Sequence, residues 1–206
     1  MVQISGRLRL WLQAPFLLSK PSERAVRCET RPAIVSDMIR DSALIKVRSA
    51  KASDSDALNR VFRDAWRQAY TGIIPPMHLE RMIRRRDVRW WRNAIKTESN
   101  LLVLEVAGVI AGYASCGAAR CGKVACGEIY EIYVAPLYQG AGLGEHLFEA
   151  CRHQLDLRHF AGLLVWALAD NVEAGDFYWR RGGRPIAQSK ERFGTTQLAK
   201  VAYSFG

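Results

Sequence analysis

Three glycines at alternate positions, Gly140, Gly142 and Gly144, could bind an anion through the backbone. They follow a strand-like segment that ends at Val134 and precede a helix-like segment that begins near Gly144. Because this stretch has almost no side-chain bulk, successive N–H groups can turn inward and meet an anion at close range. The helix adds its positive N-terminus at the same place. We therefore predict a cradle for a phosphate or diphosphate group.

Two common phosphate-binding loops do not fit these residues. A Walker loop ends in Gly-Lys-Ser/Thr, whereas Gly144 is followed by Glu145 and His146. A dinucleotide fingerprint requires G-x-G-x-x-G, whereas the spacing here is G-x-G-x-G, with no clear acidic strand end about 20 residues later. The pattern that does fit is Gln-x-x-Gly-x-Gly, which starts at Gln139 and follows a strand and a Val-x-Pro turn.

This pattern resembles the acetyl-coenzyme A loop of the GNAT N-acetyltransferases. Residues 128–136, with the sequence EIYEIYVAP, are similar to the strand that precedes the loop in that family. Residues 171–178 are similar to a second family segment, Asn-x-x-Ala-x-x-Phe-Tyr. With two motifs in the right order and separation, roughly the last 160 residues are identified as a member of the family. One departure is local, because the family usually has Gly-Phe after that tyrosine and this chain has Gly182-Gly183.

The hydrophobic spacing predicts the elements that must position this loop. A strand is expected near residues 45–48, followed by a helix from Ser53 that Ser53 or Asp54 can cap. Its buried face would consist of Leu58, Val61, Phe62, Ala65, Trp66 and Ala69. The further expected elements are a helix over 77–95, a hairpin of strands 101–106 and 109–115, a strand over 128–134, a helix over 144–158, a strand over 163–167, a helix over 172–181 and an alternating strand over 199–205.

This order of elements predicts an α/β domain of the α+β type, with a mixed sheet covered by helices. The resemblance implies a GNAT-like acyl-CoA N-acyltransferase fold, in which a central, mostly antiparallel sheet contains one parallel strand pair that splays apart. The family places coenzyme A in that split, where the pantetheine arm can pair with free backbone groups. The resemblance assigns cofactor contacts to Ile132, Tyr133, Val134, Gln139, Gly140, Ala141, Gly142, Leu143, Gly144, Asn171 and Tyr178.

Transfer of an acetyl group to an amine needs a base, because an alkyl ammonium has a pKa of about 10. Glu128 and Glu131 are the candidates, and the alternation of a strand places their side chains on opposite faces. The resemblance favours Glu128, and Glu131 is the second candidate. For both residues the alternative is a surface or salt-bridged carboxylate.

Two further roles follow from the resemblance. The backbone N–H of Val134 would stabilise the oxyanion of the tetrahedral intermediate, and the phenol of Tyr178 would donate a proton to the leaving thiolate. The alternative for Tyr178 is a packed aromatic ring with its hydroxyl at the surface. Asn171 either contacts the pantetheine arm or caps the last helix.

In this family, acceptor choice resides in the first two helices and in the final hairpin, residues 188–196. The residues concerned in the helices are Trp66, Tyr70, Ile73, Ile74, Met77 and His78, although Trp66 also continues the apolar face of its helix. We expect a small-molecule amine as acceptor, and a protein N-terminus or a lysine side chain is the second candidate. Two other classes stay open, a coenzyme A binding module without turnover and a nucleic-acid-binding protein that uses the arginines of residues 81–92.

Composition sets the remaining bounds. The chain has 206 residues, 49% of them hydrophobic, and a formal net charge of +10. We expect an N-acetyltransferase domain over residues 44–206 and a basic N-terminal extension over 1–40, which is either disordered or lies upstream of a true start at Met38. With no apolar run of about 20 residues, we expect a cytoplasmic protein, with a homodimer open as its oligomeric state.

No metal is expected. Cys116, Cys121 and Cys126 recur every five residues, whereas zinc sites favour tighter Cys-x-x-Cys pairs and nearby histidines. Reduced thiols are the simpler interpretation. His146 and His153 lie seven residues apart in a predicted helix, but no cysteine or carboxylate set completes a site with them.

Overall fold

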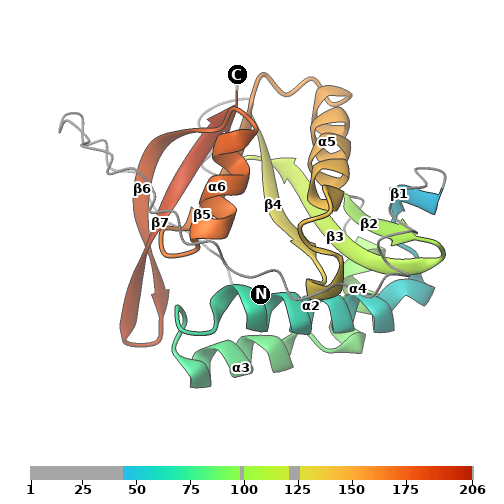
Figure 1. Ribbon diagram of the computed structural model, residues 1–206, viewed down its shortest axis with the longest axis horizontal. Coiled ribbons are helices and arrows are strands. Elements are labelled where there is room, and N and C mark those ends of the chain that lie inside the picture. The colour runs from blue at the N-terminus through green and yellow to red at the C-terminus, as the bar shows by residue number, and fades with distance from the viewer. Residues whose placement is uncertain (1–43, 98–99, 121–125, 206) are drawn as a thin grey trace.

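The computed structural model describes residues 44–97, 100–120 and 126–205 (Figure 1). The extension expected over residues 1–40 lies outside this part of the chain. The strands are β1 (Ile45–Ser49), β2 (Leu101–Val106), β3 (Val109–Ala118), β4 (Gly127–Val134), β5 (Leu163–Leu168), β6 (Arg184–Phe193) and β7 (Thr196–Phe205). The helices are α2 (Ser55–Tyr70), α3 (Pro76–Arg85), α4 (Val88–Thr97), α5 (Leu143–Asp156) and α6 (Val172–Arg180), with short 3-10 turns η2 (Ala52–Asp54) and η3 (Pro136–Tyr138).

The strands form one seven-stranded sheet in the order β1-β2-β3-β4-β5-β7-β6. All neighbouring pairs are antiparallel except β4 and β5, which are parallel. This arrangement confirms the expected mixed sheet with one parallel strand pair.

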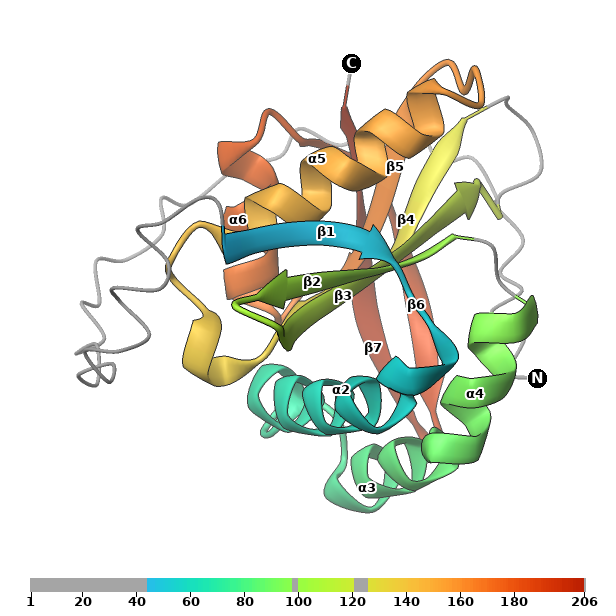
Figure 2. The same ribbon diagram turned by 90° about the vertical axis from the view of Figure 1, so that its right-hand side faces the viewer.

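Helices cover both faces of the sheet (Figure 2). On one face, α5 packs across β1 to β4 through Leu143, Leu147, Phe148, Cys151 and Leu155, all buried. On the other face, α2 buries Leu58, Val61, Phe62, Ala65 and Trp66, the spacing that predicted the helix. The sheet therefore separates two apolar cores, and β4 contributes side chains to both of them.

Two elements differ from the sequence expectation. The single helix expected over 77–95 is two helices, because the chain turns at Arg86 and Asp87 and the Asp87 carboxylate accepts the Trp90 N–H at 2.8 Å. Strand β6 begins four residues before the final hairpin expected over 188–196, and its exposed, largely polar residues are typical of an edge strand.

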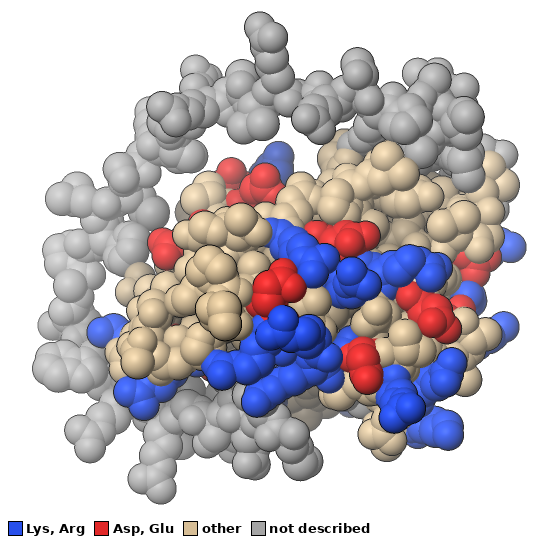
Figure 3. Space-filling view, turned by 90° about the horizontal axis from the view of Figure 1, so that it is seen from below, with Lys and Arg blue, Asp and Glu red and all other residues tan. Residues whose placement is uncertain are grey.

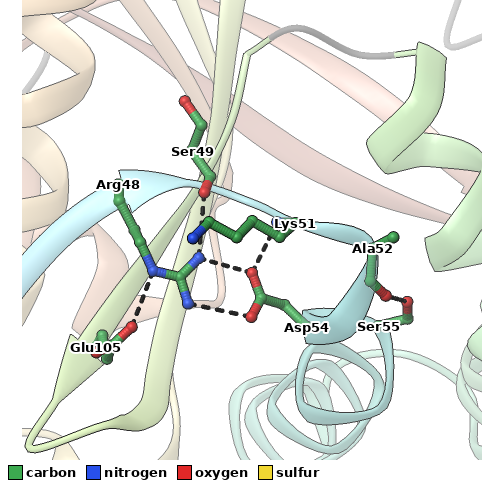
Figure 4. A network of polar contacts seen from close by, with 7 residues as sticks. All are labelled: Arg48, Ser49, Lys51, Ala52, Asp54, Ser55 and Glu105. Atoms are coloured by element: carbon green, nitrogen blue, oxygen red, sulfur yellow. Dashed lines mark hydrogen bonds and ion pairs between the residues drawn. The ribbon is translucent and has the colours of Figure 1, made fainter.

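Asp54 is the N-cap residue of α2, as expected, but its carboxylate makes no hydrogen bond to that helix and points toward Arg48 and Lys51 (Figure 4). The carboxylate accepts the Lys51 N–H at 2.7 Å and pairs with the Arg48 guanidinium at 2.7 Å. Arg48 also contacts Glu105 of β2 at 2.8 Å. The hydrogen bonds from Arg48 lower the pKa of Asp54. This network fixes the angle at which β1 passes into α2.

Packing explains why this chain has Gly183 where the family usually has a phenylalanine. A Cβ on Gly183 would lie 2.7 Å from the Phe205 ring and 2.8 Å from the Tyr178 carbonyl oxygen. Phe205, at the end of β7, therefore fills space next to α6 and packs against Phe148 and Tyr178. An aromatic ring reaches this core from β7, and only glycine fits at position 183.

Candidate active site

The glycine loop joins η3 to α5 in a conformation that favours glycine. Gly140 has φ 68° and Gly142 has φ 80°, both in the left-handed region. Gly142 is the N-cap of α5 and has no side chain to accept the first N–H groups of the helix. No atom of the described residues lies within 4 Å of where its Cβ would be. The loop therefore leaves N–H donors beside open space, an arrangement that can bind an anion.

Gln139, the first residue of the motif, holds the end of β4. Its side-chain Nε2 donates to the Val134 carbonyl at 2.8 Å, and its Oε1 accepts from Gln68 of α2 at 2.9 Å. This side chain thus links the loop to the end of β4 and to α2. Both contacts are with other residues of the protein, so they hold the loop in place.

The parallel strands β4 and β5 separate after three residue pairs. The last pair is Ile129 with Val165, and beyond it β4 continues to Val134 with β3 as its remaining neighbour. The Ala135 N–H donates to Ala111 on the β3 side, so the N–H of Val134, one residue earlier, points to the β5 side. Backbone groups at the end of β4 therefore face the gap.

Helix α6 begins beyond the end of β5 and carries two predicted site residues. Asn171 is its N-cap, and its Oδ1 accepts the Ala174 N–H at 3.1 Å. This confirms the capping role, and the same side chain also forms a hydrogen bond with the Tyr70 hydroxyl. Tyr178 is buried against the rings of Phe177, Tyr203 and Phe205, and burial raises the pKa of its phenol. The ring of Tyr178 is therefore packed, as both interpretations of this residue require.

A β-bulge at Tyr130 changes the orientation of the two candidate bases. Ser115 pairs with Glu131 and the next residue of β3 pairs with Ile129, so Tyr130 is the extra residue on β4. Ile129 lies in the α5 core, whereas Glu131 contacts Tyr113 of the opposite core. The expectation that Glu128 and Glu131 point to opposite faces is therefore wrong, because the bulge interrupts the alternation between them.

Glu131 lies beyond the last β4–β5 pair, and specific polar partners hold its carboxylate. Its carboxylate pairs with Arg86 at 2.6 Å and accepts the Tyr113 hydroxyl at 3.0 Å. The Arg86 guanidinium lies over the rings of Phe62 and Trp90, at 5.0 and 4.6 Å from their centres. Burial and the charge of Glu131 raise the pKa of Tyr113.

Glu128 lies within the paired part of β4 and only 1% of the residue is exposed. Its carboxylate accepts the backbone N–H of Arg120 at 2.9 Å and pairs with the guanidinium of the same residue at 2.5 Å. Arg86 belongs to the arginines of residues 81–92 that were considered for nucleic-acid binding, and neither it nor Arg120 was expected to pair with a glutamate. Arg86 and Glu131 are 45 residues apart in the sequence, and Arg120 and Glu128 are 8 residues apart. The periods of helices and strands do not predict contacts at these separations.

The residues expected to choose the acceptor divide into two groups. Trp66 and Ile74 are buried in the core, so the core interpretation of Trp66 is confirmed. The Tyr70 hydroxyl contacts the Tyr133 hydroxyl at 2.7 Å, and burial raises the pKa of both phenols. A Cβ on Gly194 would overlap the His78 ring, so the β6–β7 turn rests on the start of α3.

The arginines of α3 and α4 lie on the solvent side of their helices, and acidic residues lie among the basic ones on the face seen in Figure 3. Arg92 pairs with Asp56 at 3.9 Å, and Arg67 of α2 pairs with Glu80 at 2.9 Å. Within residues 44–97, 100–120 and 126–205, no three His, Cys, Asp or Glu side chains gather as a metal site, and Cys121 falls outside these ranges. No helix in the described part of the chain is long and apolar enough to cross a bilayer.

Comparison with known proteins adds an independent line of evidence. The model of the acetyltransferase (GNAT) family matches residues 58–182. The chain is 28% identical over 160 residues to YuaI of Bacillus subtilis (strain 168), described as an uncharacterized N-acetyltransferase, and this match covers 77% of the chain and 91% of YuaI.

Two solved structures have a similar fold. The PaiA N-acetyltransferase of Thermoplasma acidophilum, in complex with coenzyme A, has a TM-score of 0.63 and 17% identity, with 78% of this chain and 99% of that chain covered. The yncA protein of Salmonella typhimurium, a putative acetyltransferase with acetyl-CoA, has a TM-score of 0.58 and 21% identity, with 79% and 93% covered.

Proposed function

The chain belongs to the GNAT acetyltransferase family and is an acetyl-CoA-dependent acyltransferase, and we propose that it acetylates the primary amine of a small molecule by direct attack. The observation that carries this proposal is the position of the left-handed glycine loop at the mouth of the split between β4 and β5. The loop suits the diphosphate and the split suits the pantetheine arm. Acetyl-CoA supplies an activated thioester to an acceptor held in the same gap.

Three groups of the chain would then act on the reacting atoms. The Val134 N–H, which points into the gap, would donate to the acyl oxygen as negative charge develops on it. Tyr178 would donate a hydrogen bond to the leaving sulfur, because a phenol with an ordinary pKa of about 10 is protonated at neutral pH and burial raises the pKa of this one further.

For the base we favour Glu131, because it lies beyond the last β4–β5 pair, in the part of β4 that borders the split. Glu128 is the second candidate. It is the residue that family resemblance selects, but it lies within the paired part of the strand. An arginine holds each of the two carboxylates, Arg120 that of Glu128 and Arg86 that of Glu131, so the position along β4 decides the choice. A glutamine at either position keeps the shape of the side chain and removes the base.

A small acceptor suits the closed acceptor side of the site. The β6–β7 turn at Gly194 rests on His78 at the start of α3, and the Tyr70 and Tyr133 hydroxyls contact each other between α2 and β4. A compact amine reaches such a site more easily than a folded protein surface does. The protein-acceptor alternative predicts turnover with peptides instead.

Thiol release from acetyl-CoA, measured over a panel of small amines, peptides with free N-termini and lysine peptides, tests the proposal. We expect turnover with small amines and a loss of about a hundredfold in Tyr178→Phe and in Glu131→Gln, since a positioned acid or base contributes on this scale. Glu128→Gln is the matched control for the second of these. Turnover that survives in Glu131→Gln and falls in Glu128→Gln would reverse the assignment of the base.

Coenzyme A binding by the same variants, followed by calorimetry, separates chemistry from folding. Tyr178→Phe should bind the cofactor and fail in turnover. A wild-type protein that binds coenzyme A and releases no thiol with any amine would instead be a binding module.

A further inference from the structure

Arg181, the residue that follows α6, lies beside the glycine loop, and its neighbours do not satisfy all of its hydrogen-bond donors. Its guanidinium carbon stands 3.7 Å above the centre of the Phe177 ring, and the same ring would lie 3.0 Å from a Cβ on Gly144 of the loop. Its side chain is only 16% exposed. One nitrogen donates to the Phe177 carbonyl at 3.1 Å, but the buried Nε has no hydrogen-bond partner among the described residues.

The anionic neighbour of Arg181 is Glu145, in the first turn of α5. The distance between the guanidinium Nη2 and the carboxylate is 3.6 Å, which is an ion pair without a good hydrogen bond. Glu145 is 61% exposed and free to rotate away. A carboxylate at this helix N-terminus favours the helix, but it would repel a diphosphate bound at the same N–H groups.

We propose that Arg181 is a cofactor-binding residue that leaves Glu145 and pairs with the diphosphate of coenzyme A when the cofactor binds. This inference rests on the proposed function. The planar guanidinium can bind two phosphate oxygens at once and has a donor to spare. Glu145 then acts as an internal competitor that occupies Arg181 in the free protein, so the loop site lowers its own affinity for anions.

Calorimetric titration with coenzyme A tests this with four variants. Arg181→Gln should weaken binding about tenfold or more, the range of a charge-assisted hydrogen bond, and Arg181→Lys should lose less. Arg180→Gln is the matched control, because Arg180 is exposed on the same helical turn and should leave affinity unchanged. Glu145→Gln should strengthen binding about threefold or more, since it removes both the competitor and the repulsion.

The gain in Glu145→Gln cannot result from a damaged fold, and it should be smaller when Arg181→Gln is already present, because only the repulsion is then left to remove. Higher salt should shrink the difference between wild type and Arg181→Gln. The same difference should persist with 3′-dephospho-coenzyme A, and its disappearance there would overturn the assignment to the diphosphate.

Equal affinities of wild type and Arg181→Gln, or weaker binding by Glu145→Gln, would refute the role of Arg181 and leave the acetyltransferase proposal intact. A wild-type protein that does not bind coenzyme A would contradict the proposed function instead.

Discussion

At the scale of single residues, the pairing of Arg86 with Glu131 links the break between α3 and α4 to the bulged strand β4. The Arg86 guanidinium lies among aromatic rings, and the carboxylate takes hydrogen bonds from Arg86 and Tyr113. Such a pair is costly to break from one side, because the remaining charge stays in a poorly hydrated place. It therefore fixes the position of a candidate base.

Removal of one partner should show this cost. We expect Arg86→Met to lower the free energy of unfolding by about 2–4 kcal/mol, measured by urea denaturation. The double variant Arg86→Met/Glu131→Leu should be more stable than Arg86→Met alone, because it also removes the stranded carboxylate. A double variant less stable than Arg86→Met would show that Glu131 without its arginine is not a destabilising charge.

At the scale of elements, α6 is placed by its cap. Asn171 accepts the Ala174 N–H and thereby starts the helix that carries Tyr178 into the core. Its amide nitrogen is a donor that the cap does not use. The Asn171 side chain already forms a hydrogen bond with Tyr70, so a cofactor group in the split would share or replace that contact.

Two substitutions separate the cap from cofactor binding. Asn171→Ser keeps a good N-cap, so its thermal unfolding should match wild type, whereas Asn171→Ala should lose about 1 kcal/mol. If the amide also contacts the pantetheine arm, as we propose, both variants should bind coenzyme A several-fold more weakly. Normal affinity in Asn171→Ser would leave Asn171 with the capping role alone.

At the scale of the whole molecule, buried tyrosines gather where α2, β3, β4 and α6 meet. Burial raises the pKa of Tyr70, Tyr113, Tyr133 and Tyr178 above the value of about 10 for an exposed phenol. Each phenol therefore keeps its proton in the folded state at a pH where the unfolded chain has lost it. The folded state binds more protons there, so stability must fall as the pH rises.

Urea denaturation at pH 8, 9, 10 and 11 should reveal this linkage. The tyrosine contribution is fully present below about pH 10 and decreases above it, by up to about 1.4 kcal/mol per pH unit for each phenol. The variant Tyr70→Phe/Tyr133→Phe should flatten the decrease. Equal stability of the wild type at pH 8 and pH 11 would contradict the burial of these groups.

The amino-acid sequence by itself determined the features that depend on neighbouring residues. The glycine loop is one, because left-handed φ values at Gly140 and Gly142 follow from the absence of a side chain. The buried face of α2 and the hairpin at Ala107-Gly108 are others, because helical period and turn chemistry act over a few residues.

Only the tertiary structure decided the features that depend on distant partners. The bulge at Tyr130 turned Glu128 and Glu131 to one face, and their arginines come from different loops. Phe205 occupies the space beside Gly183 from the far end of the chain, and Arg181 meets Glu145 across two helices. Packing and charge in three dimensions set these contacts, and no pattern of neighbouring residues in the sequence predicts them.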